Sequence, residues 1–154
     1  MKLSNKDRYA LGALFDLSFY AQGYAAQVKD IAERQGIPPR FLEQIFQELK
    51  RVGLVTSKRG PQGGYSLARS PKEIRLGDLI RALDGPIALS EEKEAPTDPR
   101  KPGHDTRQVT NSILGDLSKR IESCFDAITV ADLCERAQEL GIHRPVPTRI
   151  VYSI

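Results

Sequence analysis

The sequence predicts a mainly α-helical protein with one small β-hairpin, in which an N-terminal domain is followed by a long amphipathic helix. Three observations lead to this fold class. Apolar residues recur at helical spacing through most of the chain, two short strand-like segments flank a Gly- and Pro-rich turn, and a polar stretch near residue 100 separates two ordered parts. With 154 residues, 40% of them hydrophobic and 28% charged, the chain is long enough to bury its own core.

The first helix is expected to begin after Ser4, because a hydroxyl followed three positions later by Asp7 forms a capping box. Apolar residues then recur at helical spacing at Ala10, Leu14, Leu17 and Ala21. A second helix of about two turns carries Val28, Ile31 and Ala32. It is expected to end at Gly36, since glycine readily adopts the left-handed conformation of a helix end.

The third helix is expected to start at Pro38-Pro39, because the fixed φ of proline suits the first turn. One face of this helix is apolar and comprises Leu42, Ile45, Phe46 and Leu49. The other face is polar and comprises Arg40, Glu43, Gln44, Gln47, Lys50 and Arg51. Two helices joined by a tight turn, the second with a polar face rich in Arg and Gln, are typical of a helix-turn-helix.

A β-hairpin is predicted directly after the third helix, with strands at 53–57 and 65–68 around a turn at 58–64. The turn carries Lys58 and Arg59 at its start. A hairpin in this place is a wing, and a cation at its tip can lie along the DNA backbone or enter a narrow minor groove. The sequence therefore predicts a winged helix-turn-helix domain.

A further helix at residues 76–83 completes this DNA-binding domain, which is predicted to span residues 1–84. Just before it, Ile74 is expected to pair briefly with the wing. Residues 85–108 contain little that could be buried and are expected to form a flexible loop.

A dimerisation helix and a shorter C-terminal helix are predicted within residues 109–141. A long helix with a wide apolar stripe and few other elements to cover it is most simply a dimer interface. The stripe comprises Val109, Ile113, Leu114, Leu117, Ile121, Cys124 and Phe125, and the six residues after Val109 are expected at the dimer contact. For the tail at 142–154, the sequence favours neither a disordered end nor an added strand.

Charge is unevenly distributed along the chain. Residues 1–84 contain 14 Lys and Arg against 9 Asp and Glu, a net charge of +5, whereas residues 85–154 have a net charge of −2. The basic half is the candidate for binding a polyanion such as DNA. No apolar run reaches the roughly 20 residues that cross a bilayer, so a cytoplasmic protein without a membrane partner is expected. Cys124 and Cys134 are predicted to be reduced thiols in the core.

Several motifs together are specific: Arg8-Tyr9-Ala10, DIAERQGI at 30–37, Phe41-Leu42-Glu43-Gln44, Gly53-Leu54-Val55, the wing RGPQGGY at 59–65, and residues 121–133. They resemble the Rrf2 family of bacterial transcription regulators, over nearly the whole chain up to about Leu140. The resemblance implies a homodimeric winged-helix protein that binds double-stranded DNA at a dyad-symmetric operator and usually represses transcription.

Many members of that family hold an iron–sulfur cluster through three closely spaced cysteines before the long helix. Residues 85–110 contain no cysteine here, and two cluster-ligand positions correspond by register to Gln108 and Asn111. Neutral amides are poor ligands for a soft iron–sulfur site. A family variant with an acidic and a His ligand on the first helix has Arg8 and Gly12 in those places. We therefore expect no cluster, structural metal or other cofactor, and the effector, whether small molecule or protein, stays unidentified.

On this resemblance, and from their placement, the residues expected to contact DNA are Tyr9, Arg40, Glu43, Gln44, Gln47, Lys58, Arg59 and Tyr65. Glu43 can accept a hydrogen bond from a cytosine amino group, and Gln44 can pair with adenine. Arg59 suits insertion into the minor groove, and Lys58 suits a phosphate contact. The two tyrosines either hydrogen-bond phosphates or simply pack.

Two other functions remain open from the sequence: a winged helix used only for protein contacts, and a thiol-based redox regulator acting through Cys124. Catalysis is not expected. The sequence has no Gly-rich phosphate loop opening a helix and no metal-spaced His/Cys cluster, and its two histidines, His104 and His143, form no convincing nucleophile–base pair.

Overall fold

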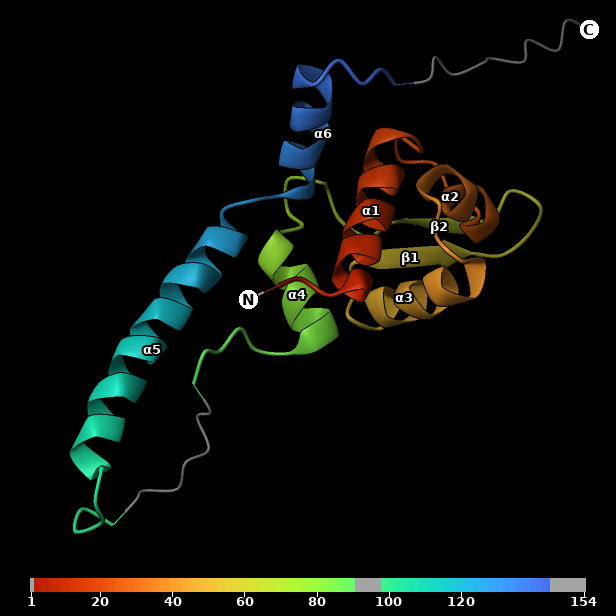
Figure 1. Cartoon of the computed structure of the whole chain (residues 1–154). Coiled ribbons are helices and arrows are strands. Elements are labelled where there is room, and N and C mark those ends of the chain that lie inside the picture. Colours follow the sequence, from red (N-terminus) through yellow and green to blue (C-terminus); the bar gives the residue numbers. More distant parts are fainter. Residues whose placement is uncertain (1, 91–97, 145–154) are drawn as a thin grey trace, which may run out of the picture.

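The computed structural model describes residues 2–90 and 98–144. Within them the chain forms six helices and one two-stranded antiparallel sheet, which confirms the predicted fold class. The elements are α1 (Asn5–Phe19), α2 (Val28–Gln35), α3 (Pro39–Arg51), β1 (Val55–Lys58), β2 (Gly64–Leu67), α4 (Leu76–Asp84), α5 (His104–Asp126) and α6 (Val130–Glu139). Figure 1 shows α1 to α4 and the hairpin gathered into one body, from which α5 projects.

Local signals set the start of α1 and the end of α2, as predicted. The Ser4 hydroxyl accepts a hydrogen bond from the Asp7 amide at 3.1 Å, and Asp7 Oδ2 accepts one from the Ser4 amide at 2.9 Å. This is the expected capping box at the start of α1. At the end of α2, Gly36 has φ 63° and ψ 34°, the left-handed conformation that glycine adopts without a Cβ clash.

The core lies between α1, α2, α3 and α4. The predicted apolar face of α3 is at most 1% exposed at all four of its positions. Each of these side chains contributes about 1.5–3 kcal/mol by leaving water. Other fully buried side chains that pack against it are Leu14, Leu17, Ile31, Leu54, Ile74 and Leu79.

The wing is a short hairpin in which Val55 lies opposite Leu67 and Lys58 opposite Gly64. The first strand therefore continues through Lys58, one position beyond its predicted end at residue 57. The turn itself is closed by a hydrogen bond from the Gly63 amide to the Gly60 carbonyl at 2.9 Å.

A third backbone segment completes the sheet. The amide and carbonyl of Ala26, which precedes α2, each bond to Tyr65 of β2 at 2.8 Å. Gly64 beside it has φ 140°, and a Cβ at this position would overlap the Ala26 carbonyl. The glycine therefore lets the wing lie directly against the segment that enters α2.

The expected pairing of Ile74 with the wing is wrong. The Ile74 carbonyl instead accepts a hydrogen bond from the Val130 amide at 3.0 Å, and the Leu76 amide donates to the Ile128 carbonyl at 2.8 Å. This segment thus pairs with the link between α5 and α6. Sequence periodicity could not reveal the partner, because the two segments meet only in the folded chain.

The long helix α5 begins at His104, earlier than the predicted start at residue 109. It packs against α4, whereas α6 returns to pack against α1. A capping box of Thr129 with Asp132 starts α6. No described helix is both long and apolar enough to cross a membrane. Of the predicted tail, residues 145–154 lie outside the described part of the chain.

Candidate nucleic-acid interface

The polar face of α3 forms the centre of the candidate interface. Arg40, Glu43, Gln44 and Gln47 are all exposed. Their spacing of three and four residues places them on one face of the helix, opposite the buried apolar face. Together they form a polar strip about 10 Å long.

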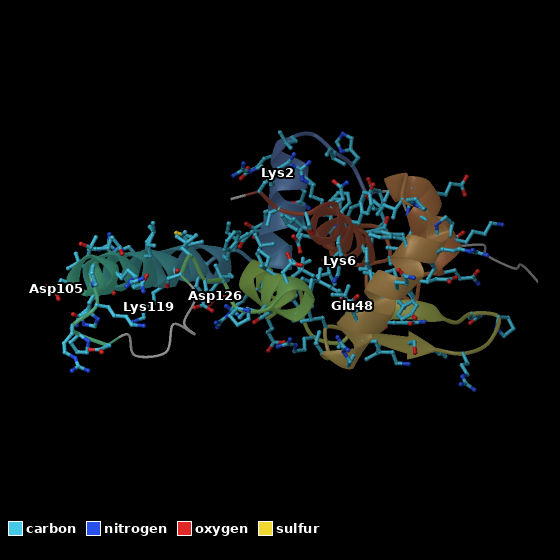
Figure 2. All side chains as sticks on the ribbon, turned by 60° about the horizontal axis from the view of Figure 1, so that its bottom comes forward. Lys2, Lys6, Glu48, Asp105, Lys119 and Asp126 are labelled. Carbon is cyan, nitrogen blue, oxygen red and sulfur yellow. The ribbon has the colours of Figure 1, made fainter. Side chains whose placement is uncertain are left out.

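Contacts on both sides hold α3 in place. Tyr9 of α1 meets Phe41 edge-on at 5.6 Å between ring centroids, and Tyr65 of the wing stacks on Phe46 at 4.4 Å. Lys6 of α1 also pairs with Glu48 of α3 at 2.9 Å (Figure 2). The two tyrosines expected at the DNA are half-buried and engaged in packing, so their observed contribution is to orient the recognition helix.

A polar network that the sequence reasoning missed joins α1 to α2. Asp16 is completely buried, and Arg34 donates to both of its carboxylate oxygens at 2.7 and 3.0 Å. Gln35 donates a third hydrogen bond to Asp16 at 2.8 Å. The hydrogen bond to Asp16 raises the pKa of Arg34 above its ordinary value. Asp16 and Arg34 are 18 positions apart in the sequence, so no local pattern predicts that they pair.

The wing presents two cations beside the recognition helix. Lys58 ends β1 and Arg59 begins the turn, and both side chains are exposed. The ammonium of Lys50, at the end of α3, donates to the Ser57 hydroxyl at 2.6 Å and ties the base of the wing to α3. The wing is therefore attached to the C-terminal end of α3, with Lys58 and Arg59 exposed to solvent.

A groove of about 600 Å³ runs between the wing and the connection from α1 to α2. Its lining includes Tyr24, Gln27, Lys58, Gln62 and Ser66. Tyr24 is 78% exposed and was not among the predicted contacts. The lining also contains the Asp30 carboxylate, but hydroxyl, amide and ammonium groups are the usual partners of backbone phosphates, so this groove is a candidate extension of the interface.

The predicted stripe on α5 divides into two parts. Leu114, Ile121 and Phe125 are half-buried, because they face the side that α4 and its following segment cover. Ile113 and Leu117 remain 63% and 43% exposed. Val109, which is 63% exposed and one turn before Ile113, belongs to the same exposed part of the stripe.

The two cysteines differ in their surroundings. Cys134 is buried as predicted, and its thiol lies 3.2 Å from the Ser18 hydroxyl. The prediction of a core thiol is wrong for Cys124, which is exposed on α5. Its neighbours in the apolar stripe suggested burial, but the covering elements reach only the adjacent face of the helix.

Of the two cluster-ligand positions of the family, Asn111 lies at a groove of about 580 Å³ between residues 86–90 and α5, whereas Gln108 is exposed and is not in its lining. Asn111 lines it together with hydroxyl, carboxylate and ammonium groups, and neither cysteine is in this lining. Among the described residues, no group of three or more His, Cys, Asp or Glu is arranged to hold a metal ion. This donor set does not fit an iron–sulfur cluster, which requires thiolates.

Comparison with known proteins agrees with the geometry. Residues 3–136 match the Rrf2 family, described as an iron-dependent transcriptional regulator. The HTH-type transcriptional regulator IscR of Aliivibrio salmonicida is 42% identical over 135 residues, which cover 86% of this chain and 77% of that protein. Among solved structures, T. potens IscR has a TM-score of 0.70 at 37% identity and 94% coverage of both chains. CymR (YrzC), the global cysteine regulator of B. subtilis, has a TM-score of 0.68 at 32% identity, covering 88% of this chain and 98% of CymR.

Proposed function

This chain belongs to the Rrf2 family of DNA-binding transcriptional regulators, and we propose that it binds a dyad-symmetric operator as a homodimer and represses transcription without an iron–sulfur cluster. The observation that carries the proposal is the exposed polar strip of α3 beside the two wing cations. A helix enters the major groove while the wing follows the backbone, so the strip and the cations contact the same duplex.

Within this proposal, α3 reads bases and the wing supplies much of the affinity. Glu43 accepts a hydrogen bond from a cytosine amino group, Gln44 pairs with adenine, and Arg40 and Gln47 lie on the same exposed strip. Arg59 enters the minor groove, where its charge is attracted by the enhanced negative potential. Lys58 and the adjoining groove with Tyr24 neutralise and bind phosphates.

The exposed apolar strip on α5 supports the homodimer. Three large apolar side chains stand in a row on one helix face, Val109, Ile113 and Leu117, with 43% to 63% of each exposed. A second copy of the chain would cover the strip in an isologous contact and place two α3 helices on successive half-sites about 34–36 Å apart.

A second candidate function rests on the exposure of Cys124. An exposed thiol is accessible to oxidants, and CymR from S. aureus, 32% identical to this chain, has been solved in an oxidized form. On this alternative, oxidation at Cys124 on the dimer helix changes DNA affinity. Intact mass and DNA binding after mild peroxide test it, and an unmodified protein with unchanged affinity excludes it.

The main proposal is tested with metal-free protein and the DNA upstream of its own gene, measured by fluorescence anisotropy against a scrambled duplex over a salt series. We expect selective binding that weakens steeply with salt and is lost in Arg59→Ala. Arg69→Ala, which removes an exposed charge after the wing, is the matched control and should bind nearly as the wild type. A basic face that tolerates both substitutions would instead favour a winged helix used for protein contacts.

A further inference from the structure

An ion cluster joins α5 to the DNA-binding body. Arg81 of α4 donates to Glu122 at 2.7 Å and to the two oxygens of Asp126 at 2.7 and 3.3 Å, both on α5. It also reaches Asp78 of its own helix at 3.2 Å. The hydrogen bonds to Asp126 above all raise the pKa of Arg81, so the guanidinium stays charged. We call these four residues the Arg81 cluster.

The two helices approach closely at this cluster. A Cβ on Gly77 of α4 would overlap the Asp126 carboxylate, so a larger residue here would require the carboxylate to shift from its place beside Arg81. Just beyond the cluster, the backbone bond from Leu76 to Ile128 and the bridge between Arg75 and Thr129 anchor the C-terminal end of α5.

The rest of α5 extends away from these anchors. Figure 2 shows Asp126 beside α4 and Asp105 at the opposite end of the helix. A helix of 23 residues is about 35 Å long, so a rotation of about 10° at the anchored end moves the far end by about 6 Å. The exposed strip proposed for dimerisation begins at Val109, near that far end. Successive base pairs along one strand are about 3.4 Å apart, so a displacement of this size corresponds to one or two base pairs on DNA.

We propose that the Arg81 cluster sets the distance between the two recognition helices of the dimer and thereby selects the half-site spacing of the operator. The inference rests on the proposed function as a dimeric DNA-binding regulator. In it Arg81 is a positioning residue, which acts on DNA only through the angle between α4 and α5.

Electrostatics explains why one residue has this effect. Arg81 is the cation between three carboxylates, and its loss leaves Asp78, Glu122 and Asp126 to repel one another across the joint. The four side chains are 28% to 39% exposed, so each pair adds little to folding stability. Removing the arginine should therefore loosen the angle while leaving the folded domain intact.

The test begins with duplexes selected by the wild-type protein from a random-sequence library. Four duplexes then carry the two half-sites of the selected palindrome at the selected spacing, at one base pair less, at one more and at two more. A fifth duplex carries a single half-site. We expect the wild type to prefer one spacing by at least about tenfold. For Arg81→Gln we expect a preference below about threefold, with single-half-site affinity within about twofold of the wild type.

Two further variants separate positioning from charge. Gly77→Ala displaces Asp126 without changing charge and should flatten the spacing preference in the same way. Arg81→Lys should keep only part of the wild-type spacing preference, because a single ammonium cannot bond both α5 carboxylates as the forked guanidinium does. Arg136→Gln, which removes an exposed 2.9 Å pair with Glu139 on α6, is the matched control and should keep the wild-type profile.

The inference is overturned if Arg81→Gln and Gly77→Ala keep the wild-type spacing preference. It is equally overturned if their affinity for the single half-site falls in parallel with that for every spaced duplex, since that pattern reports general loss of structure. A wild-type protein that selects no sequence overturns the proposed function and the inference with it. Selective binding with an unchanged spacing preference overturns the inference alone.

Discussion

Arg34 on α2 donates hydrogen bonds to both carboxylate oxygens of Asp16 on α1, at 2.7 and 3.0 Å, and Asp16 is completely buried. The pair joins the first helix to the helix-turn-helix, and neither residue is among the proposed DNA contacts. A buried carboxylate depends on its partner for the interactions that water would otherwise supply.

Replacing Arg34 should therefore cost stability. We expect Arg34→Met to lower the free energy of unfolding by about 2–4 kcal/mol, because Asp16 is left buried with only Gln35 to satisfy it. Urea unfolding followed by circular dichroism measures the change. Arg69→Met, at an exposed position, is the control. Equal midpoints for the two variants would contradict a structural role for the pair.

Glu43 should determine which base pair is accepted at one position of each half-site. We expect Glu43→Ala to lose about 1–3 kcal/mol of discrimination there while binding other sites as before, because it removes a base contact and not a phosphate contact. Anisotropy with single-base-pair variants of the selected operator measures it. Lys58→Ala is the contrasting variant: its affinity should fall on every duplex, and its salt slope should decrease by about one.

A charge in the exposed strip of α5 should separate the subunits. Ile113 is 63% exposed, so Ile113→Glu should leave the fold unchanged while placing a carboxylate in the proposed dimer contact. Sedimentation equilibrium is expected to give a dimer for the wild type and a monomer for the variant. Gln108→Glu, an exposed change on another face of the same helix, should remain dimeric. A dimeric Ile113→Glu protein would place the interface elsewhere.

Asp84, at the end of α4, gives the folded protein a pH dependence. Loss of hydration of its carboxyl group, together with the hydrogen bond and charge of Asp7, raises the pKa of Asp84. The stability linked to this shift is fully present below the unfolded pKa of about 3.9 and is lost as pH rises through the higher folded value. Among the described residues, Asp7 Oδ1 is buried and accepts no hydrogen bond, so no donor offsets the charge that Asp84 carries when it ionises beside it.

Replacing Asp84 by Asn should consequently stabilise the protein at neutral pH. The gain in Tm of Asp84→Asn over the wild type is expected at pH 7 and should shrink as the pH is lowered toward 4. Thermal unfolding at the two pH values tests this. A gain that is constant with pH would show that the effect is not electrostatic.

Features encoded within a few residues could be predicted, and features that depend on distant segments could not. The cap at Ser4, the stop at Gly36 and the buried face of α3 each follow from spacing within one helix. The partner of Ile74 and the contact between Asp16 and Arg34 depend on the tertiary arrangement alone.

The candidate interface was predictable for the same reason. The exposed strip of α3 follows from helical periodicity, and the wing cations follow from their position at a turn. Tyr24 was missed because its place beside the wing depends on the pairing of Ala26 with Tyr65. The exposure of Cys124 was missed because the apolar stripe of α5 is wider than the surface that covers it.

The return of the chain after α5 has a consequence for assembly. Both ends of this helix are continuous with segments of the same subunit, and α6 packs against α1 of its own body. Exchange of α5 between subunits would require the Ile74–Val130 and Leu76–Ile128 bonds to open. In the proposed dimer we therefore expect each subunit to fold first and to associate in a separate, concentration-dependent step, without a domain swap.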